Sequence, residues 1–118
     1  MSPAPSFGAT RSDALVASID VASSVDPGTD LVYVVVLENR SDRDLSLDPC
    51  PVFVQQLGRD SAAHQLNCVI ATLPATSWVR LQMRLPVPAD ASPGGQTLSW
   101  TVEVGGEIAA ATAVVTIR

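Results

Sequence analysis

Residues 98–117 read LSWTVEVGGEIAAATAVVTI, and this stretch decides the fold class. Apolar and polar residues alternate on both sides of Gly105-Gly106, which is the pattern of half-buried strands. Two consecutive glycines suit a two-residue hairpin turn, because the primed turns need positive φ. In that register Trp100 faces Ala111, and the neighbouring alanines leave room for the indole. The stretch therefore predicts an antiparallel hairpin and not a helix.

Further strands are predicted upstream at short and regular spacing, each ended by glycine, proline or polar residues. Residues 13–21 and 78–85 alternate between apolar and polar side chains, as half-buried strands do. Residues 31–38 are apolar on both faces, which is typical of a strand in the middle of a sheet or covered on its second face. We therefore predict an all-β chain with about seven strands in two antiparallel sheets; a small closed barrel is the alternative.

Length and charge limit the classes of protein to consider. The 118 residues suffice for one domain with its own core, predicted at residues 12–118. Residues 1–11 contain prolines and serines and are predicted to be a disordered or linker segment. The net charge of -5 disfavours nucleic-acid binding. No apolar run approaches the roughly 20 residues of a membrane-spanning helix, so direct membrane insertion is not expected.

Both cysteines lie in one predicted hairpin, equidistant from Arg59. If the chain reverses at Arg59, Cys50 faces Cys68 and Val54 faces His64 across an antiparallel pair. A disulfide there closes a ring of about 19 residues, worth roughly 3 kcal/mol in the chain-entropy model. Because disulfides persist in oxidising compartments, the pair also predicts an extracytoplasmic location, secreted or at the cell surface; two buried free thiols are the alternative. No signal peptide is visible, so a signal or anchor is expected to lie outside this sequence.

We find no set of residues for catalysis, a metal or a cofactor. His64 is the only histidine and has no evident nucleophile and orienting acid beside it, so the chain is predicted not to be an enzyme. One histidine with two cysteines falls short of the four ligands of a zinc site. The aspartates of residues 42–48 could gather calcium, but aspartate is common in turns, and no metal or cofactor is expected. Asn39-Arg40-Ser41 matches a glycosylation acceptor, although a turn suffices to explain it.

One outward row of side chains is a candidate protein-contact surface. Alternation directs Trp78, Arg80 and Arg84 away from the core. Exposed tryptophan beside arginine is common at binding hot spots. The structural alternative is that a loop covers the indole or that Arg80 stacks on it. The second apolar face of residues 31–38 is another candidate contact surface, unless a loop or the N-terminal segment covers it.

The order of strands and turns resembles a known family. Leu31–Asn39 is followed by Ser41-Asp42, a turn precedes Trp78–Leu85, and Pro86-Val87-Pro88 and Gly94-Gly95 lead to Leu98–Val104. This arrangement resembles bacterial immunoglobulin-like modules, and among them it is similar to the family of the Bacillus intracellular proteinase inhibitor. The resemblance spans residues 31–104 and implies an immunoglobulin-like sandwich of the Greek-key type. No inhibitory loop is carried over from that family.

These features predict a non-catalytic module for protein interaction, or a spacer, in an exported or cell-envelope bacterial protein, with a protein as its partner. The alternative from a different class is a proteinase inhibitor that acts through an exposed loop. The two candidate loops are Pro86-Val87-Pro88-Ala89-Asp90 and Asp48-Pro49-Cys50-Pro51.

Overall fold

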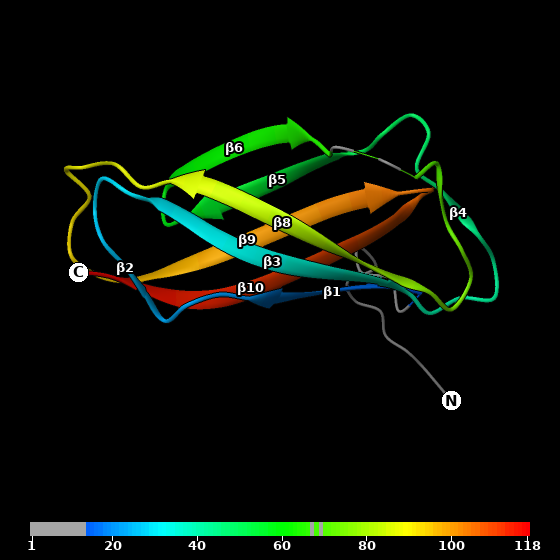
Figure 1. The fold of residues 1–118 in the computed structure, drawn as a ribbon, viewed down its shortest axis with the longest axis horizontal. Coiled ribbons are helices and arrows are strands. Elements are labelled where there is room, and N and C mark those ends of the chain that lie inside the picture. The colour runs from blue at the N-terminus through cyan, green and yellow to red at the C-terminus, as the bar shows by residue number, and fades with distance from the viewer. Residues whose placement is uncertain (1–13, 67, 69) are drawn as a thin grey trace.

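The computed structural model describes residues 14–66, 68 and 70–118. All of the regular secondary structure in these residues is β-strand (Figure 1). In chain order the strands are β1 (Leu15–Asp20), β2 (Ser24–Val25), β3 (Asp30–Asn39), β4 (Leu45–Ser46), β5 (Val52–Leu57), β6 (Asp60–Gln65), β7 (Thr72–Leu73), β8 (Trp78–Pro86), β9 (Gly94–Val104) and β10 (Glu107–Ile117). The all-β prediction is confirmed. The predicted linker, residues 1–11, lies outside the described residues, so its boundary stays a prediction.

Hydrogen bonding groups the described strands into three sheets, ordered β1-β3-β8, β2-β10-β9-β5-β6 and β4-β7. Inward side chains of all three sheets form one hydrophobic core. The sequence predicts about seven strands in two sheets, whereas the described chain has ten strands in three. The surplus consists of β2, β4 and β7, which have two residues each and are too short to show an alternation of side chains.

The predicted central position of the apolar strand is confirmed, because β3 lies between β1 and β8. Its odd-numbered residues, from Leu31 to Leu37, point into the core and are buried. Its even-numbered valines face the other way and are half-buried or exposed. A strand that is apolar on both faces thus occupies the middle of the sheet, with one of its faces on the surface.

The β9–β10 hairpin has the predicted register, with Trp100 opposite Ala111. Gly105 and Gly106 have φ values of 58° and 83°, so both turn residues occupy the region that favours glycine. The Trp100 side chain is 0% exposed, and its Nε1 has no hydrogen-bond partner in the described part of the chain. The indole therefore contributes apolar packing at the centre of the core.

The β5–β6 hairpin differs from its predicted register by one residue. Leu57 pairs with Asp60, so the turn holds two residues, Gly58 and Arg59, and is not centred on Arg59. Gly58 has a φ of 61°, which a two-residue turn requires at its first position. His64 consequently lies opposite Phe53 and not opposite Val54.

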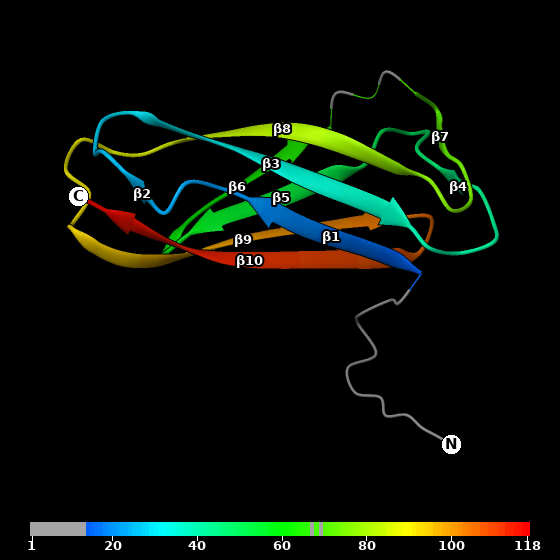
Figure 2. The same ribbon diagram turned by 60° about the horizontal axis from the view of Figure 1, so that its bottom comes forward.

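The two larger sheets lie one over the other, and they are linked differently along their two sides, which we call the closed side and the open side (Figure 2). On the closed side, β1 runs beside β10, and the same N-terminal segment supplies β2, which pairs in parallel with the end of β10. Residues 15–25 thus belong first to one sheet and then to the other. On the open side, β8 and β6 are the last strands of their sheets, and no strand pairing joins them among the described residues.

Candidate interaction surface

The structure brings the two sequence-predicted contact surfaces together on one face. We call this the outer face: Val32, Val34 and Val36 of β3 with Trp78, Arg80, Gln82 and Arg84 of β8. Antiparallel pairing sets Val36 opposite Arg80, Val34 opposite Gln82 and Val32 opposite Arg84. Residues directly opposite each other share a face of the sheet, so the valine row and the tryptophan–arginine row are adjacent.

The outer face combines apolar surface with positive charge. The Trp78 side chain is 61% exposed, and Val32 is 42% exposed. Nη1 of Arg84 lies 3.1 Å from Oδ2 of Asp30, in a solvent-exposed pair of small energetic worth. None of the ion pairs in the described part of the chain involves Arg80. A shallow depression of about 310 Å³ lies between Val36, Glu38, Trp78 and Arg80.

An apolar groove lies on the open side, next to the outer face. Its volume is about 240 Å³, and its wall on one side is formed by β8, with Val79, Leu81 and Met83 facing inward. Leu66, Cys68 and Ile70, which follow β6, form part of the opposite wall. Arg80 and Gln82 also line the groove, so the outer face and the groove meet at the edge of β8. Sequence reasoning misses this groove because its walls come from segments far apart in the chain.

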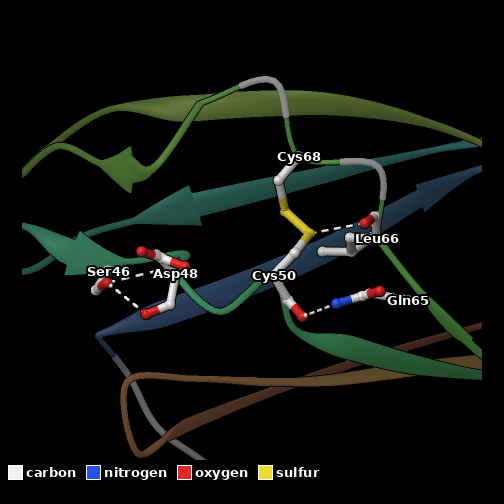
Figure 3. The surroundings of a disulfide bond; sticks show 6 residues. All are labelled: Ser46, Asp48, Cys50, Gln65, Leu66 and Cys68. Atoms are coloured by element: carbon white, nitrogen blue, oxygen red, sulfur yellow. Dashed lines mark hydrogen bonds between the residues drawn. A yellow bond between two sulfur atoms is a disulfide. The ribbon is translucent and has the colours of Figure 1, made fainter.

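The predicted disulfide between Cys50 and Cys68 is present in the structure, with the two Cα atoms 5.9 Å apart (Figure 3). Both cysteines lie just outside the β5–β6 ladder, which ends at Val52 and Gln65. Nε2 of Gln65 donates a hydrogen bond of 3.0 Å to the Cys50 carbonyl, so the base of the hairpin is also held by a side chain. Because the disulfide lies beyond the last ladder pair, the one-residue change in register does not prevent it.

His64 is the only histidine in the sequence, and it lies at an exposed position on the edge strand β6. Its ring centroid lies 5.8 Å from that of Phe53, which in turn stacks 5.8 Å from Trp100. These neighbours are aromatic and supply neither a nucleophile nor a carboxylate. In the part of the chain that the structure describes, no group of three or more histidine, cysteine or acidic side chains is arranged to hold a metal.

Two buried polar side chains join different parts of the molecule. Gln55, on β5, is 2% exposed; it accepts a hydrogen bond from the Tyr33 hydroxyl and donates one of 3.0 Å to the Arg84 carbonyl. This chain of bonds connects β3, β5 and β8 across the core. Burial raises the pKa of the Tyr33 hydroxyl, because the charged phenolate would be poorly solvated there.

Asn39 is the second buried polar residue, at 0% exposure. Its Nδ2 donates to the carbonyls of Arg43, Leu73 and Pro74, and its Oδ1 accepts from the Ser41 backbone N–H. The side chain thus fixes the turn after β3 against the turn before β8. An amide that is buried and fully bonded is not accessible to a glycosylating enzyme, so the structure supports the turn interpretation of Asn39-Arg40-Ser41.

Comparisons with known proteins show the fold. No protein-family model matches the sequence, including that of the proteinase inhibitor family, and no curated protein matches it. The chain is similar to the CARDB domain of the PF1109 protein from Pyrococcus furiosus, an immunoglobulin-like β-sandwich. The solution structure of that domain has 14% identity and a TM-score of 0.63, with 88% of this chain and 94% of that chain covered.

Two further structures are similar in fold. The crystal structure of the same CARDB domain in complex with di-metal ions has 13% identity and a TM-score of 0.59, covering 88% of this chain and 87% of that chain. AvmM, which catalyses macrocyclization in alchivemycin A biosynthesis, has 12% identity and a TM-score of 0.63, covering 90% of this chain and 89% of that chain. At such identities the likeness concerns the fold alone.

Among the described residues, no helix is long and apolar enough to span a membrane.

Proposed function

We propose that this chain is a non-catalytic protein-interaction module and that its outer face is the contact surface. The observation that carries the proposal is the union of an exposed tryptophan, two arginines and a row of valines on one face of β3 and β8. Tryptophan and arginine are the residue types most enriched at binding hot spots, and apolar surface around them excludes water on binding. The partner is a protein, since a net charge of -5 disfavours nucleic acid.

We further propose that the domain is an immunoglobulin-like, Greek-key sandwich in an exported or cell-envelope bacterial protein. The similarity in fold to the CARDB domain supports the first part. The Cys50–Cys68 disulfide supports the second, because oxidised cysteine pairs persist mainly outside the cytosol. The expected compartment can be checked by measuring free thiols in the native and the reduced protein; two thiols in the unreduced, denatured protein would contradict it.

The fold alone also permits other activities. AvmM is an enzyme and the CARDB domain binds metal ions, but those properties belong to those proteins. In this chain, His64 is exposed and has Phe53 as its ring neighbour. The arrangement offers better support for a binding surface than for a catalytic centre, so the proposal includes neither catalysis nor a cofactor.

Proteinase inhibition through a loop is the second candidate function, and the contacts of the two loops support it less well. In the loop of residues 86–90, Val87 is 3% exposed. The Val87 N–H donates to the Thr29 carbonyl at 2.9 Å, and its carbonyl accepts from the Gly28 N–H at 3.0 Å. In the loop of residues 48–51, the Pro51 carbonyl accepts from the Leu66 N–H at 2.8 Å, and the Cys50 carbonyl accepts from the Gln65 side chain at 3.0 Å. An inhibitory loop must present such groups to a protease. An absence of inhibition across several proteases would remove this candidate.

The test of the interaction proposal is a retention assay with envelope and secreted fractions of a bacterium that produces this chain. We expect bound proteins to be retained by the unaltered chain and lost with Trp78→Ala and with Arg80→Glu. Val114→Ser is the matched control, because Val114 is 70% exposed on β10, away from the outer face. Equal retention by all four proteins would overturn the proposal.

A further inference from the structure

The pairing of β3 with β8 determines which backbone groups of β8 face outward. At the two ends of this ladder, the Asn39 N–H donates to the Ser77 carbonyl at 2.8 Å, and the Val87 N–H donates to the Thr29 carbonyl at 2.9 Å. Both bonds join odd-numbered residues, and antiparallel ladders repeat every two residues. The odd-numbered residues of β8 therefore bond to β3, while the backbone groups of its even-numbered residues point to the free edge.

The hydrogen bonds of β8 agree with this assignment of its even-numbered backbone groups to the free edge. The Arg84 carbonyl, an even-numbered group, accepts its hydrogen bond from Gln55 on the other sheet and not from β3. By the same alternation, the backbone N–H and C=O groups of Arg80 and Gln82 point away from β3, and β8 is the last strand of its sheet among the described residues. The stretch from Trp78 to Gln82 is thus an open edge, and unpaired edge groups are a template for another strand.

The apolar groove gives the free edge of β8 a second feature that suits a bound strand. The side chains of Val79, Leu81 and Met83 point into the groove beside the edge. A strand placed along β8 would direct every second side chain into the same space, because side chains alternate between faces. Its remaining side chains would lie on the outer face, next to Arg80 and Arg84.

We propose that the partner binds as an extended segment that adds a strand to the free edge of β8, with apolar side chains in the groove and acidic side chains beside the arginines. This inference rests on the proposed interaction function and names the chemistry of its partner. Backbone hydrogen bonds supply affinity in such strand addition, and the alternate side chains supply selectivity. Acidic residues are expected because Arg80 has no ion-pair partner in the described part of the chain.

A second copy of this chain is a poorer occupant of the edge. If two β8 strands paired antiparallel about Gln82, Arg80 of each copy would lie opposite Arg84 of the other. Like charges directly opposite each other destabilise an antiparallel pair. The charge of the edge therefore favours a different, acidic strand over self-association.

The experiment uses the full chain, isotope-labelled for NMR, and a blocked peptide of about eight residues in which valine and glutamate alternate. We expect the amide signals of Arg80 and Gln82 to shift and their hydrogen exchange to slow when the peptide is added. A peptide in which lysine replaces glutamate should bind about tenfold more weakly, which corresponds to replacing attraction by repulsion at two arginines.

Two proline variants test the backbone contact directly. Gln82→Pro removes an N–H from the free edge, where proline is tolerated because no ladder bond is lost, and should abolish binding. Ala63→Pro is the matched control: the Leu66 N–H donates to the Pro51 carbonyl, so the N–H of Ala63 also points away from its neighbour, but on β6. This control should bind the peptide as the unaltered chain does. Arg80→Glu, which leaves the backbone intact, should largely remove the preference between the two peptides, because the new carboxylate offsets the charge of Arg84.

The outcomes separate this inference from the proposed function. If the signals of Val32, Val34 and Val36 shift while Gln82→Pro still binds fully, strand addition is overturned, but the outer face remains a contact surface. If no signal shifts with either peptide, strand addition is likewise overturned. The retention assay with Trp78→Ala and Arg80→Glu decides the proposed function independently of both results.

Discussion

The closed and open sides of the molecule are held together by different kinds of bonds. On the closed side, one continuous segment, residues 15–25, pairs first with β3 and then with β10. On the open side, β8 and β6 belong to different sheets, and a side chain of β5, the strand beside β6, makes the link to β8. Gln55 bonds to the Arg84 carbonyl, and the Cys50–Cys68 disulfide holds the segment that forms the far wall of the groove.

This difference indicates which side of the molecule resists opening, and it bears on where we propose that a partner binds. On the closed side, residues 15–25 pair with strands of both sheets. Moving the sheets apart there would break ladder hydrogen bonds on one sheet or the other, so this pairing resists separation of the sheets. Side-chain links leave edge backbone groups unpaired and a groove between the walls. We therefore propose that the open side is the part of the fold available for binding, and four measurements can test the contrast between the two sides.

The largest effect is expected from the disulfide. Replacing both cysteines, Cys50→Ala with Cys68→Ala, should lower the free energy of unfolding by about 3 kcal/mol, because the unfolded chain regains the freedom of the open ring. Urea denaturation measures this change. For amides that exchange by local opening, hydrogen exchange should accelerate more in β6 and near Leu66 than in β1. Equal acceleration in β1 would contradict the contrast between the sides. A reductant should have no further effect on this variant, which serves as the control.

The second effect concerns the polar link across the core. Tyr33→Phe removes the hydrogen bond to Gln55 and leaves the buried Gln55 oxygen without a donor, so we expect a loss of about 2 kcal/mol in urea denaturation. Gln55→Leu in the Tyr33→Phe background replaces both partners by apolar groups and should recover part of the loss. No loss in the single variant would show that this link does not hold the sheets together.

The same tyrosine predicts an alkaline limit to stability. Its pKa is raised in the folded protein above the ordinary value of 10.0, so the folded state binds the hydroxyl proton more tightly than the unfolded state. The stabilisation is therefore fully present below about pH 10 and is lost as the pH rises beyond it. Tyr33 is the only tyrosine, so tyrosinate absorbance measures this titration without interference. Tyr33→Phe should remain folded at neutral pH, with the lower stability expected above, and should lack this alkaline slope; an identical slope in the variant would contradict the assignment.

The smallest effect is expected at the turn that leads into β8. Thr76 has a φ of 59°, where a β-branched side chain is strained. Thr76→Gly should raise the free energy of unfolding by about 1 kcal/mol, as measured by thermal or urea denaturation. Thr76→Val keeps the branched Cβ and should give no gain. A loss of stability with glycine would show that the contacts of Thr76 outweigh the strain.

The two hairpins show what could be predicted about the fold from sequence. The register of β9–β10 is predicted correctly because Gly105 and Gly106 identify a turn type by themselves. The register of β5–β6 is predicted wrongly because it is derived from the symmetry of Cys50 and Cys68. These residues lie beyond the ladder, where the backbone is free of the hydrogen-bonding register, so a disulfide does not determine the pairing inside the hairpin.

The candidate surface was predictable only in its parts. Alternation identifies Trp78, Arg80 and Arg84 as outward, and it identifies a second apolar face on β3, but their adjacency depends on which strands pair. Whether the odd- or the even-numbered residues of β8 hydrogen-bond to β3 decides which backbone groups lie at the free edge. The types of side chain along the strand do not indicate this. The buried Gln55 was also missed, because the first residue of the polar pair Gln55-Gln56 gives no sign of burial until its partner Tyr33 is known.

The contrast between Trp78 and Trp100 has a spectroscopic consequence. These are the only two tryptophans, one 61% exposed on the outer face and the other 0% exposed in the core. Fluorescence of the first should resemble that of indole in water and be accessible to a soluble quencher, whereas the second should be protected until the chain unfolds. Trp100 can therefore report folding while Trp78 reports occupancy of the outer face, and the molecule needs no attached dye to distinguish the two events.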